Sequence, residues 1–80
     1  MIKQIEDYLK EKGYNTSGEY ADSDDIVLTD DNVDIHIANG ELSVEITAYS
    51  IVVVPIKLFF FRCYSFEDFK SKYEILINKL

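Results

Sequence analysis

The stretch VDIHIANGELSVEITA, residues 33 to 48, decides the fold. Apolar and polar residues alternate on both sides of Asn39-Gly40, with Val33, Ile35 and Ile37 before it and Leu42, Val44, Ile46 and Ala48 after it. Alternation with a period of two is typical of strands that bury one face, and Asn-Gly is the strongest short signal for a hairpin. The stretch therefore predicts two antiparallel strands joined by a tight turn.

A two-residue loop at Asn39-Gly40 also predicts a register in which the apolar residues share one face. The predicted pairs are Ile37 with Leu42, Ile35 with Val44, and Val33 with Ile46. The same register places Asp34 directly opposite Glu45 on the other face, where two like charges destabilise a sheet. Because stability does not favour this pair, we interpret it as part of a binding surface.

The flanking segments extend the sheet. A turn near Asp31-Asn32 predicts that Leu28 pairs with Ile35 and Ile26 with Ile37. Residues 51–64 form a continuous β-branched and aromatic run, which is interpreted as a fourth strand or as the end of the third. Its phase is ambiguous: if Val52, Val54, Ile56, Leu58 and Phe60 face inward, then Ile51, Val53, Lys57, Phe59 and Phe61 face the other side.

Helices are expected at both ends of the chain. Residues 2–12 place Ile2, Ile5 and Leu9 on one helical face, and Gly13 follows as a C-terminal cap. Residues 14–24 are interpreted as a loop in which 19–21 add a short edge strand. Ser65 and Asp68 have the spacing of a capping box, and an apolar helical stripe follows at Phe66, Phe69, Tyr73, Leu76, Ile77 and Leu80.

These elements predict one α+β domain over residues 1–80. It has an N-terminal helix, an antiparallel meander of three to four strands and a C-terminal helix, with both helices on one face of the sheet. The 48% hydrophobic residues, including eleven Phe and Tyr, favour a folded chain despite a net charge of −7. The single cysteine, Cys63, predicts a reduced cytoplasmic protein in which this residue is either packing or a reactive thiol beside Arg62.

Acidic residues are concentrated in the middle of the chain. Nine lie between Glu19 and Glu45, and no Lys or Arg occurs from Gly13 to Ile56. The candidate partner-binding residues are Asp22, Asp24, Asp25, Asp30, Asp31, Asp34, Glu41 and Glu45. One-sided charge attracts cationic surfaces over a long range, although aspartate also forms turns and keeps proteins soluble.

Other kinds of site fit the sequence less well. Asp30, Asn32, Asp34 and Glu41 have the spacing of a calcium-binding EF-hand loop, but Ile35 stands where that loop needs glycine. We expect no metal and no cofactor. The chain has no nucleophile elbow and no phosphate-cradling glycine-rich loop, so an enzyme is not expected. The longest apolar run is too short to cross a membrane, and the net charge of −7 disfavours direct binding to nucleic acid.

The sequence thus favours a non-enzymatic binding protein whose acidic sheet and loops engage a basic protein. A nucleic-acid-binding protein is the most economical partner, because carboxylates can occupy its phosphate groove. In its acid-rich span from Glu19 to Glu45 and its helix–meander–helix order, the chain resembles the small acidic inhibitors of phages and mobile elements, including anti-CRISPR proteins. The resemblance implies that a nuclease or effector complex is blocked sterically or by mimicry in the host cytoplasm, and it assigns no site residue.

A second hypothesis is a small structural or assembly protein that forms a homodimer. Phe59 and Phe61 on the last strand, together with Ile51 and Val53, exceed what the core of an 80-residue chain can hide. An exposed apolar strip marks an interface, so Phe59 and Phe61 are the candidates for self-association.

Overall fold

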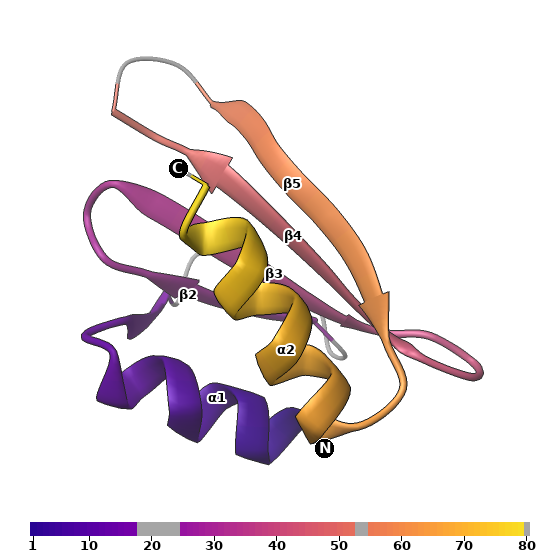
Figure 1. The fold of residues 1–80 in the computed structure, drawn as a ribbon. Helices are drawn as coiled ribbons and strands as arrows, with labels where there is room; N and C mark the ends of the chain where they lie inside the picture. The colour runs from indigo at the N-terminus through magenta and orange to yellow at the C-terminus, as the bar shows by residue number, and fades with distance from the viewer. Residues whose placement is uncertain (18–24, 53–54, 80) are drawn as a thin grey trace.

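The computed structural model describes residues 1–17, 25–52 and 55–79, and statements about the structure refer to these residues. The elements are α1 (Ile2–Glu11), β1 (Asn15–Ser17), β2 (Asp25–Thr29), β3 (Val33–Asn39), β4 (Val44–Ser50), β5 (Ile56–Cys63) and α2 (Phe66–Ile77). The strands form one antiparallel sheet in the order β1-β2-β3-β4-β5 (Figure 1). The predicted α+β class and helix–meander–helix order are confirmed, with five strands instead of three or four.

The additional strand, β1, comes from a segment expected to be a loop. Asn15 pairs with Thr29 and Ser17 pairs with Val27, so β1 forms the edge beside β2. Its sequence, Asn-Thr-Ser, is polar on both faces and lacks the apolar alternation that marks a half-buried strand. The short strand expected at 19–21 lies outside the described residues.

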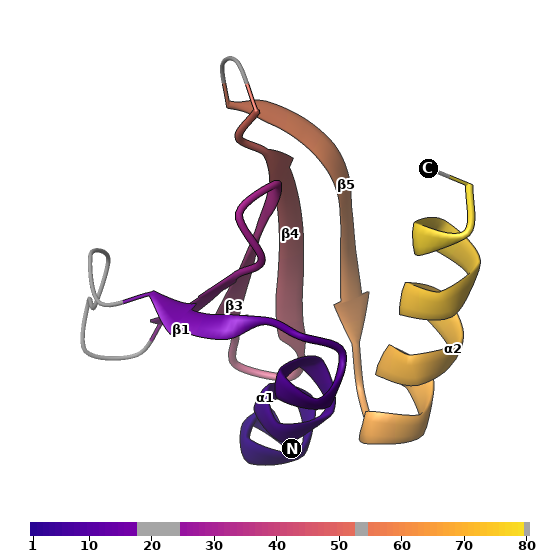
Figure 2. The same ribbon diagram turned by 90° about the vertical axis from the view of Figure 1, so that its left-hand side faces the viewer.

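Both helices pack on the same face of the sheet (Figures 1 and 2). One cluster joins Ile5 and Leu9 of α1 with Phe69 and Tyr73 of α2 and with the inward residues of the sheet. Fully burying one such side chain contributes about 1.5–3 kcal/mol, so this face supplies most of the hydrophobic stabilisation. Neither helix is long and apolar enough to cross a membrane, as judged over the described residues.

The end of α1 follows the sequence prediction. Gly13 has a positive φ of 102°, a conformation that glycine adopts without a steric penalty. Its N–H donates to the Lys10 carbonyl, and the Tyr14 N–H donates to the Leu9 carbonyl, both at 3.1 Å. This is the Schellman arrangement, and it leads the chain directly into β1.

The start of α2 is a variant of the predicted capping box. The Asp68 N–H donates to Ser65 Oγ at 3.0 Å, as expected for a serine at the N-cap. The Asp68 carboxylate accepts from the Tyr64 N–H at 3.0 Å, one residue earlier than in the usual box. This backbone bond, assisted by Lys72, lowers the pKa of Asp68.

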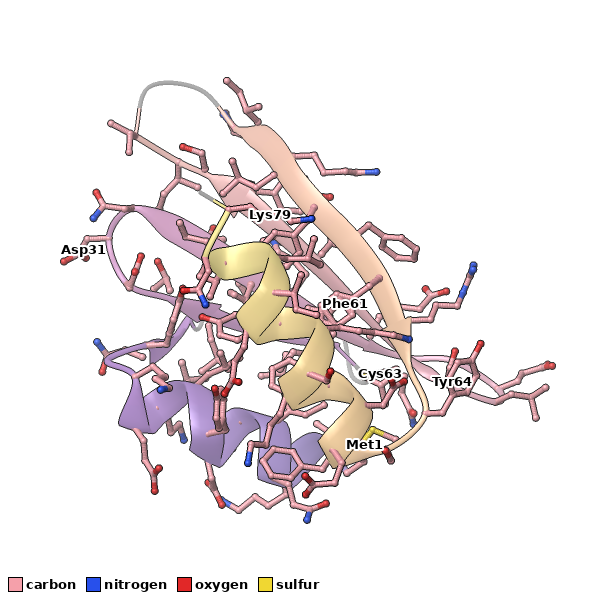
Figure 3. The ribbon with its side chains drawn as sticks, viewed as in Figure 1. Met1, Asp31, Phe61, Cys63, Tyr64 and Lys79 are labelled. Carbon is pink, nitrogen blue, oxygen red and sulfur yellow. The ribbon has the colours of Figure 1, made fainter. Side chains whose placement is uncertain are left out.

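The turn between β2 and β3 is also as predicted. Leu28 pairs with Ile35 and Ile26 pairs with Ile37. Asp30 Oδ1 accepts hydrogen bonds from the backbone N–H groups of residues 32 and 33, at 3.0 and 2.8 Å. Asp31 has a positive φ of 79° and projects from the tip of the turn (Figure 3). Aspartate suits both positions because its short carboxylate bonds the local backbone and it tolerates the left-handed region.

The predicted register of the β3–β4 hairpin is wrong. Residues 40–43 form a four-residue loop, closed by the Gly40 N–H donating to the Ser43 carbonyl at 2.8 Å. Ile37 pairs with Ile46, and Leu42, expected in the sheet, lies in the loop at 90% exposure. The longer loop lets all of β3 pair, from Val33 to Asn39. A two-residue loop would leave the end of β4 beyond the reach of β3.

The changed register separates Asp34 from Glu45. Asp34 lies opposite Tyr49, and Glu45 lies opposite Ala38, so the predicted like-charge pair does not exist. The partner of Ile37 has moved by four residues along β4, from Leu42 to Ile46. Because an even shift keeps every side chain on its face, the predicted inward and outward sets are nevertheless correct within β3 and β4, and Leu42 is the residue of the predicted inward set that lies outside them.

The phase of β5 corrects the expectation for self-association. Phe59 and Phe61 are 8% and 9% exposed and belong to the helix-side core, so the prediction that they form a surface strip is wrong. A register irregularity between Ala48 and Tyr49 places Lys57 opposite Tyr49, on the other face. A continuous apolar run with an extra residue in it carries no readable alternation, which is why the sequence left the phase open.

Candidate functional site

The sheet has an open face, opposite the two helices (Figure 2). We define it by those outward residues of β2 to β5 that are partly or fully exposed: Thr29, Asp34, His36, Ala38, Glu45, Thr47, Tyr49, Lys57, Phe60 and Arg62. Among the described residues, neither helix packs on this face. A sheet face that carries aromatic and charged side chains has the composition expected of an interaction surface.

A hollow of about 210 Å³ lies at one end of the open face. Its lining consists of Asp34, His36, Tyr49, Ile51 and Pro55. Asp34 and Tyr49 are direct cross-strand partners, and the rings of His36 and Tyr49 meet edge to face with centroids 4.9 Å apart. The hollow therefore combines one carboxylate, two aromatic rings and an apolar rim.

The rim of the hollow is held by the backbone just after β4. The Ile51 N–H donates to the Asn32 carbonyl at 2.9 Å, which continues the β3–β4 pairing by one more bond. Pro55, which directly precedes β5, lines the same hollow. The hollow exists only where the end of β4 faces the start of β3, so it depends on the observed register.

A second feature of the open face is the Phe60 ring, which is 42% exposed. The Lys57 ammonium and the Arg62 guanidinium lie over it, at 5.8 and 5.4 Å from the ring centroid. Arg62 also pairs with Glu45, with Nε and Oε2 3.2 Å apart. Lys57 and Arg62 therefore interact with Phe60 and Glu45, which lie outside the hollow, and neither cation lines the hollow.

The structure does not gather the predicted partner-binding residues into one patch. Asp30, Asp31 and Asp34 lie at one end of β3, whereas Glu41 and Glu45 lie at the other end. Asp25 begins β2, and Asp22 and Asp24 lie outside the described residues. Asp34 lines the hollow.

Two of these acidic residues already have structural roles. Asp30 accepts the two backbone bonds that close the β2–β3 turn, and Glu45 holds Arg62. Turn chemistry therefore accounts for Asp30, as the sequence allowed. Asp34 has no such turn role, because it lies within β3 and faces Tyr49.

Sequence reasoning missed Tyr49, Ile51 and Pro55 as site residues. Tyr49 continues the outward series of Glu45 and Thr47, so the alternation itself was a signal that could have found it. Ile51 and Pro55 were not predictable in this way, because they line the hollow through the path of the chain after β4.

The other chemically notable side chains are buried on the helix side. Cys63 is fully buried, its Sγ donates to the Val44 carbonyl at 3.5 Å, and burial raises the pKa of its thiol. A thiol held in its protonated form is a poor nucleophile, so the structure favours packing over reactivity for this residue.

Two further hollows, of about 450 and 350 Å³, flank Tyr8 between the helices. The first is lined by Gln4, Asp7, Tyr8, Glu11, Phe66 and Lys70, and the second by Tyr8, Lys12, Tyr73, Glu74, Ile77 and Asn78. Both are lined by charges of each sign.

No family model, curated protein or solved structure matches this chain. The function is therefore argued from the geometry and charge of the open face.

Proposed function

We propose that this protein is a non-enzymatic binding protein whose open face engages a basic surface of a partner protein. The observation that carries the proposal is the carboxylate of Asp34 beside the ring of Tyr49, on a sheet face that no helix covers. Exposed aromatic residues are enriched at the energetic centres of interfaces. A carboxylate among them selects for positive charge on the partner.

The net charge of the chain also favours a positively charged partner. The net charge is −7, and the segment from Gly13 to Ile56, which supplies β1 to β4, contains no Lys or Arg. A field of one sign draws in a cationic partner and raises the association rate. Asp31 and Glu41, both exposed at opposite ends of β3, extend this field beyond the open face.

A nucleic-acid-binding protein is the class of partner that we favour. Such proteins present clustered Lys and Arg side chains to phosphate groups, and carboxylates on a firm sheet can take the place of phosphates. Binding in that groove would exclude the nucleic acid and make the protein an inhibitor.

Affinity capture from a cell lysate tests this function. Wild-type protein is compared with the variant Asp34→Asn/Tyr49→Leu, which neutralises and flattens the site, and with the variant Glu67→Gln on α2 as a control. We expect a basic, nucleic-acid-binding protein to be retained by the wild type and the control and lost with the double variant. Retention of the same proteins by all three forms would contradict the proposal.

The identified partner then allows a kinetic test. Its association rate should fall by about tenfold or more between about 0.05 M and 0.5 M salt, because the attraction is screened beyond a few ångströms. An association rate that does not change with salt would show that charge does not guide the encounter.

A further inference from the structure

We infer that the hollow on the open face is a receptor for a single arginine side chain of the partner. This inference rests on the proposed function and narrows it from a basic surface to one residue. It follows from the shape and the chemistry of the five lining residues, Asp34, His36, Tyr49, Ile51 and Pro55.

The lining of the hollow matches the chemical parts of an arginine side chain. The Asp34 carboxylate, half-buried on β3, can accept two parallel N–H bonds from a guanidinium. Ile51 and Pro55 give an apolar wall for the methylene stem, which arginine keeps in contact with apolar surface while its head bonds polar groups. A volume of about 210 Å³ accommodates one long side chain.

The rings of His36 and Tyr49 both line the hollow and meet edge to face, so a ligand in it lies beside aromatic side chains. A planar guanidinium stacks on an aromatic face, whereas the compact, strongly hydrated ammonium of lysine gains less from both the ring and the carboxylate. The site therefore prefers arginine to lysine.

The nearby cations, Lys57 and Arg62, do not fill the hollow. Lys57 lies opposite Tyr49 in the register, but its Nζ lies over Phe60, 5.8 Å from the ring centroid. Arg62 lies over the same ring and pairs with Glu45. The carboxylate at the other end of the face is thus already neutralised by an arginine from the chain itself. That arrangement of carboxylate, ring and guanidinium is what we infer for Asp34 and Tyr49 with a partner arginine.

The experiment is a titration of isotope-labelled protein followed by NMR, with three blocked tripeptides as probes. They are acetyl-Gly-Arg-Gly-amide, the same peptide with lysine, and the same peptide with citrulline, which has the shape of arginine without its charge. We expect the arginine peptide to give saturable shifts that are largest at residues 34, 36, 49 and 51. The lysine peptide should bind more weakly, and the citrulline peptide should cause no saturable shift.

Matched variants assign the effect to the hollow. Asp34→Asn should weaken binding of the arginine peptide by about tenfold, the range for a charge-assisted bond at a partly exposed site. Glu45→Gln removes the same charge from the same face outside the hollow and should leave binding within about twofold. Tyr49→Phe should retain binding, whereas Tyr49→Leu should lose it, because the ring face is needed and the hydroxyl is not.

A blocked decapeptide of alternating Arg and Gly separates this inference from the proposed function. If the decapeptide shifts the open face while the arginine tripeptide gives no saturable shift at the hollow, the arginine receptor is wrong and the basic partner stands. Equal binding of the arginine and citrulline peptides would also overturn the receptor. If neither peptide perturbs the open face, both the receptor and the proposed function are contradicted.

Discussion

The two faces of the sheet differ in what their side chains do, although the same strands supply both. On the helix side, the row Ile37, Ile46 and Phe61 is apolar and buried under α1 and α2. On the open face, the neighbouring row His36, Thr47 and Phe60 is polar or aromatic and only partly buried. Because side chains alternate along each strand, a step of one residue moves from a buried position that stabilises the fold to a position on the open face.

The largest contrast is expected between two adjacent phenylalanines of β5. Phe61→Ala empties a packed core position and should lower the free energy of unfolding by about 3–5 kcal/mol. Phe60→Ala should lower it by less than about 1 kcal/mol, because the ring lies on the open face at 42% exposure. Urea denaturation measures both. Similar losses from the two substitutions would mean that the assigned phase of β5 is wrong.

Alkaline pH should act through the helix side. Burial, followed by the hydrogen bond to Glu74, raises the pKa of Tyr8 to about 12, and burial also raises the pKa values of Tyr14 and Tyr73. A tyrosine whose pKa is raised in the folded state stabilises the fold below its unfolded pKa of about 10, and this contribution is lost as pH rises toward 12. Stability should therefore fall steeply above pH 10.

Absorbance at 295 nm during a pH titration reports tyrosine ionisation and tests this expectation. Unfolding should accompany the ionisation of the buried tyrosines, and Tyr8→Phe should reduce the slope of stability against pH above 10. A protein that ionises all six tyrosines near pH 10 while remaining folded would contradict the burial of this cluster.

A smaller effect should come from the loop that sets the register of both faces. A Cβ at Gly40 would lie 2.8 Å from the Ser43 carbonyl oxygen, so Gly40→Ala must shift the backbone. We expect a loss of about 1–3 kcal/mol, the range for a forced steric contact. Leu42→Ala, in the same loop at 90% exposure, is the control and should change stability by less than about 0.5 kcal/mol. If Gly40→Ala and Leu42→Ala both left the stability unchanged, the loop conformation described for residues 40–43 would be wrong.

The smallest effect is expected from the ion pair on the open face. Glu45 and Arg62 form an exposed pair, and such pairs contribute about 0.2–1 kcal/mol. Glu45→Gln should therefore be slightly destabilising, whereas the sequence-based register predicted relief of repulsion from Asp34. A double-mutant cycle with Arg62→Gln measures the coupling. A rise in melting temperature for Glu45→Gln alone would instead support the register predicted from the sequence, in which Asp34 lies opposite Glu45 and the loop has two residues.

Much of the fold was predictable because its signals are local. Gly13 marks the end of α1, Ser65 marks the start of α2, and the side-chain carboxylate of Asp30 closes a turn by accepting bonds from nearby backbone N–H groups. Each of these depends on residues within a few positions of one another. Alternation likewise assigned the faces of β3 and β4, because an even error in register leaves the faces unchanged.

The errors arose where contacts between segments distant in the sequence determine the structure. The loop at Gly40 is longer than Asn-Gly suggests because β4 pairs along the whole of β3 on one side and along β5 on the other. β1 carries no apolar pattern, and the bulge at Ala48/Tyr49 hides the phase of β5. Asp34 was predicted as a site residue from its charge. The hollow that it shares with Tyr49 was not predicted, because it depends on the pairing of β3 with β4.

The central claim is that the open face binds and the helix side holds the fold, and methyl NMR tests it most directly. Ala38 and Thr47 carry methyl groups on the open face, while Ile46 and Ala48 carry them on the helix side of the same hairpin. Titration with the Arg-Gly decapeptide should shift the Ala38 and Thr47 methyl signals and leave those of Ile46 and Ala48 in place. Shifts confined to the helix-side methyls, or no saturable shift in either pair, would contradict the account.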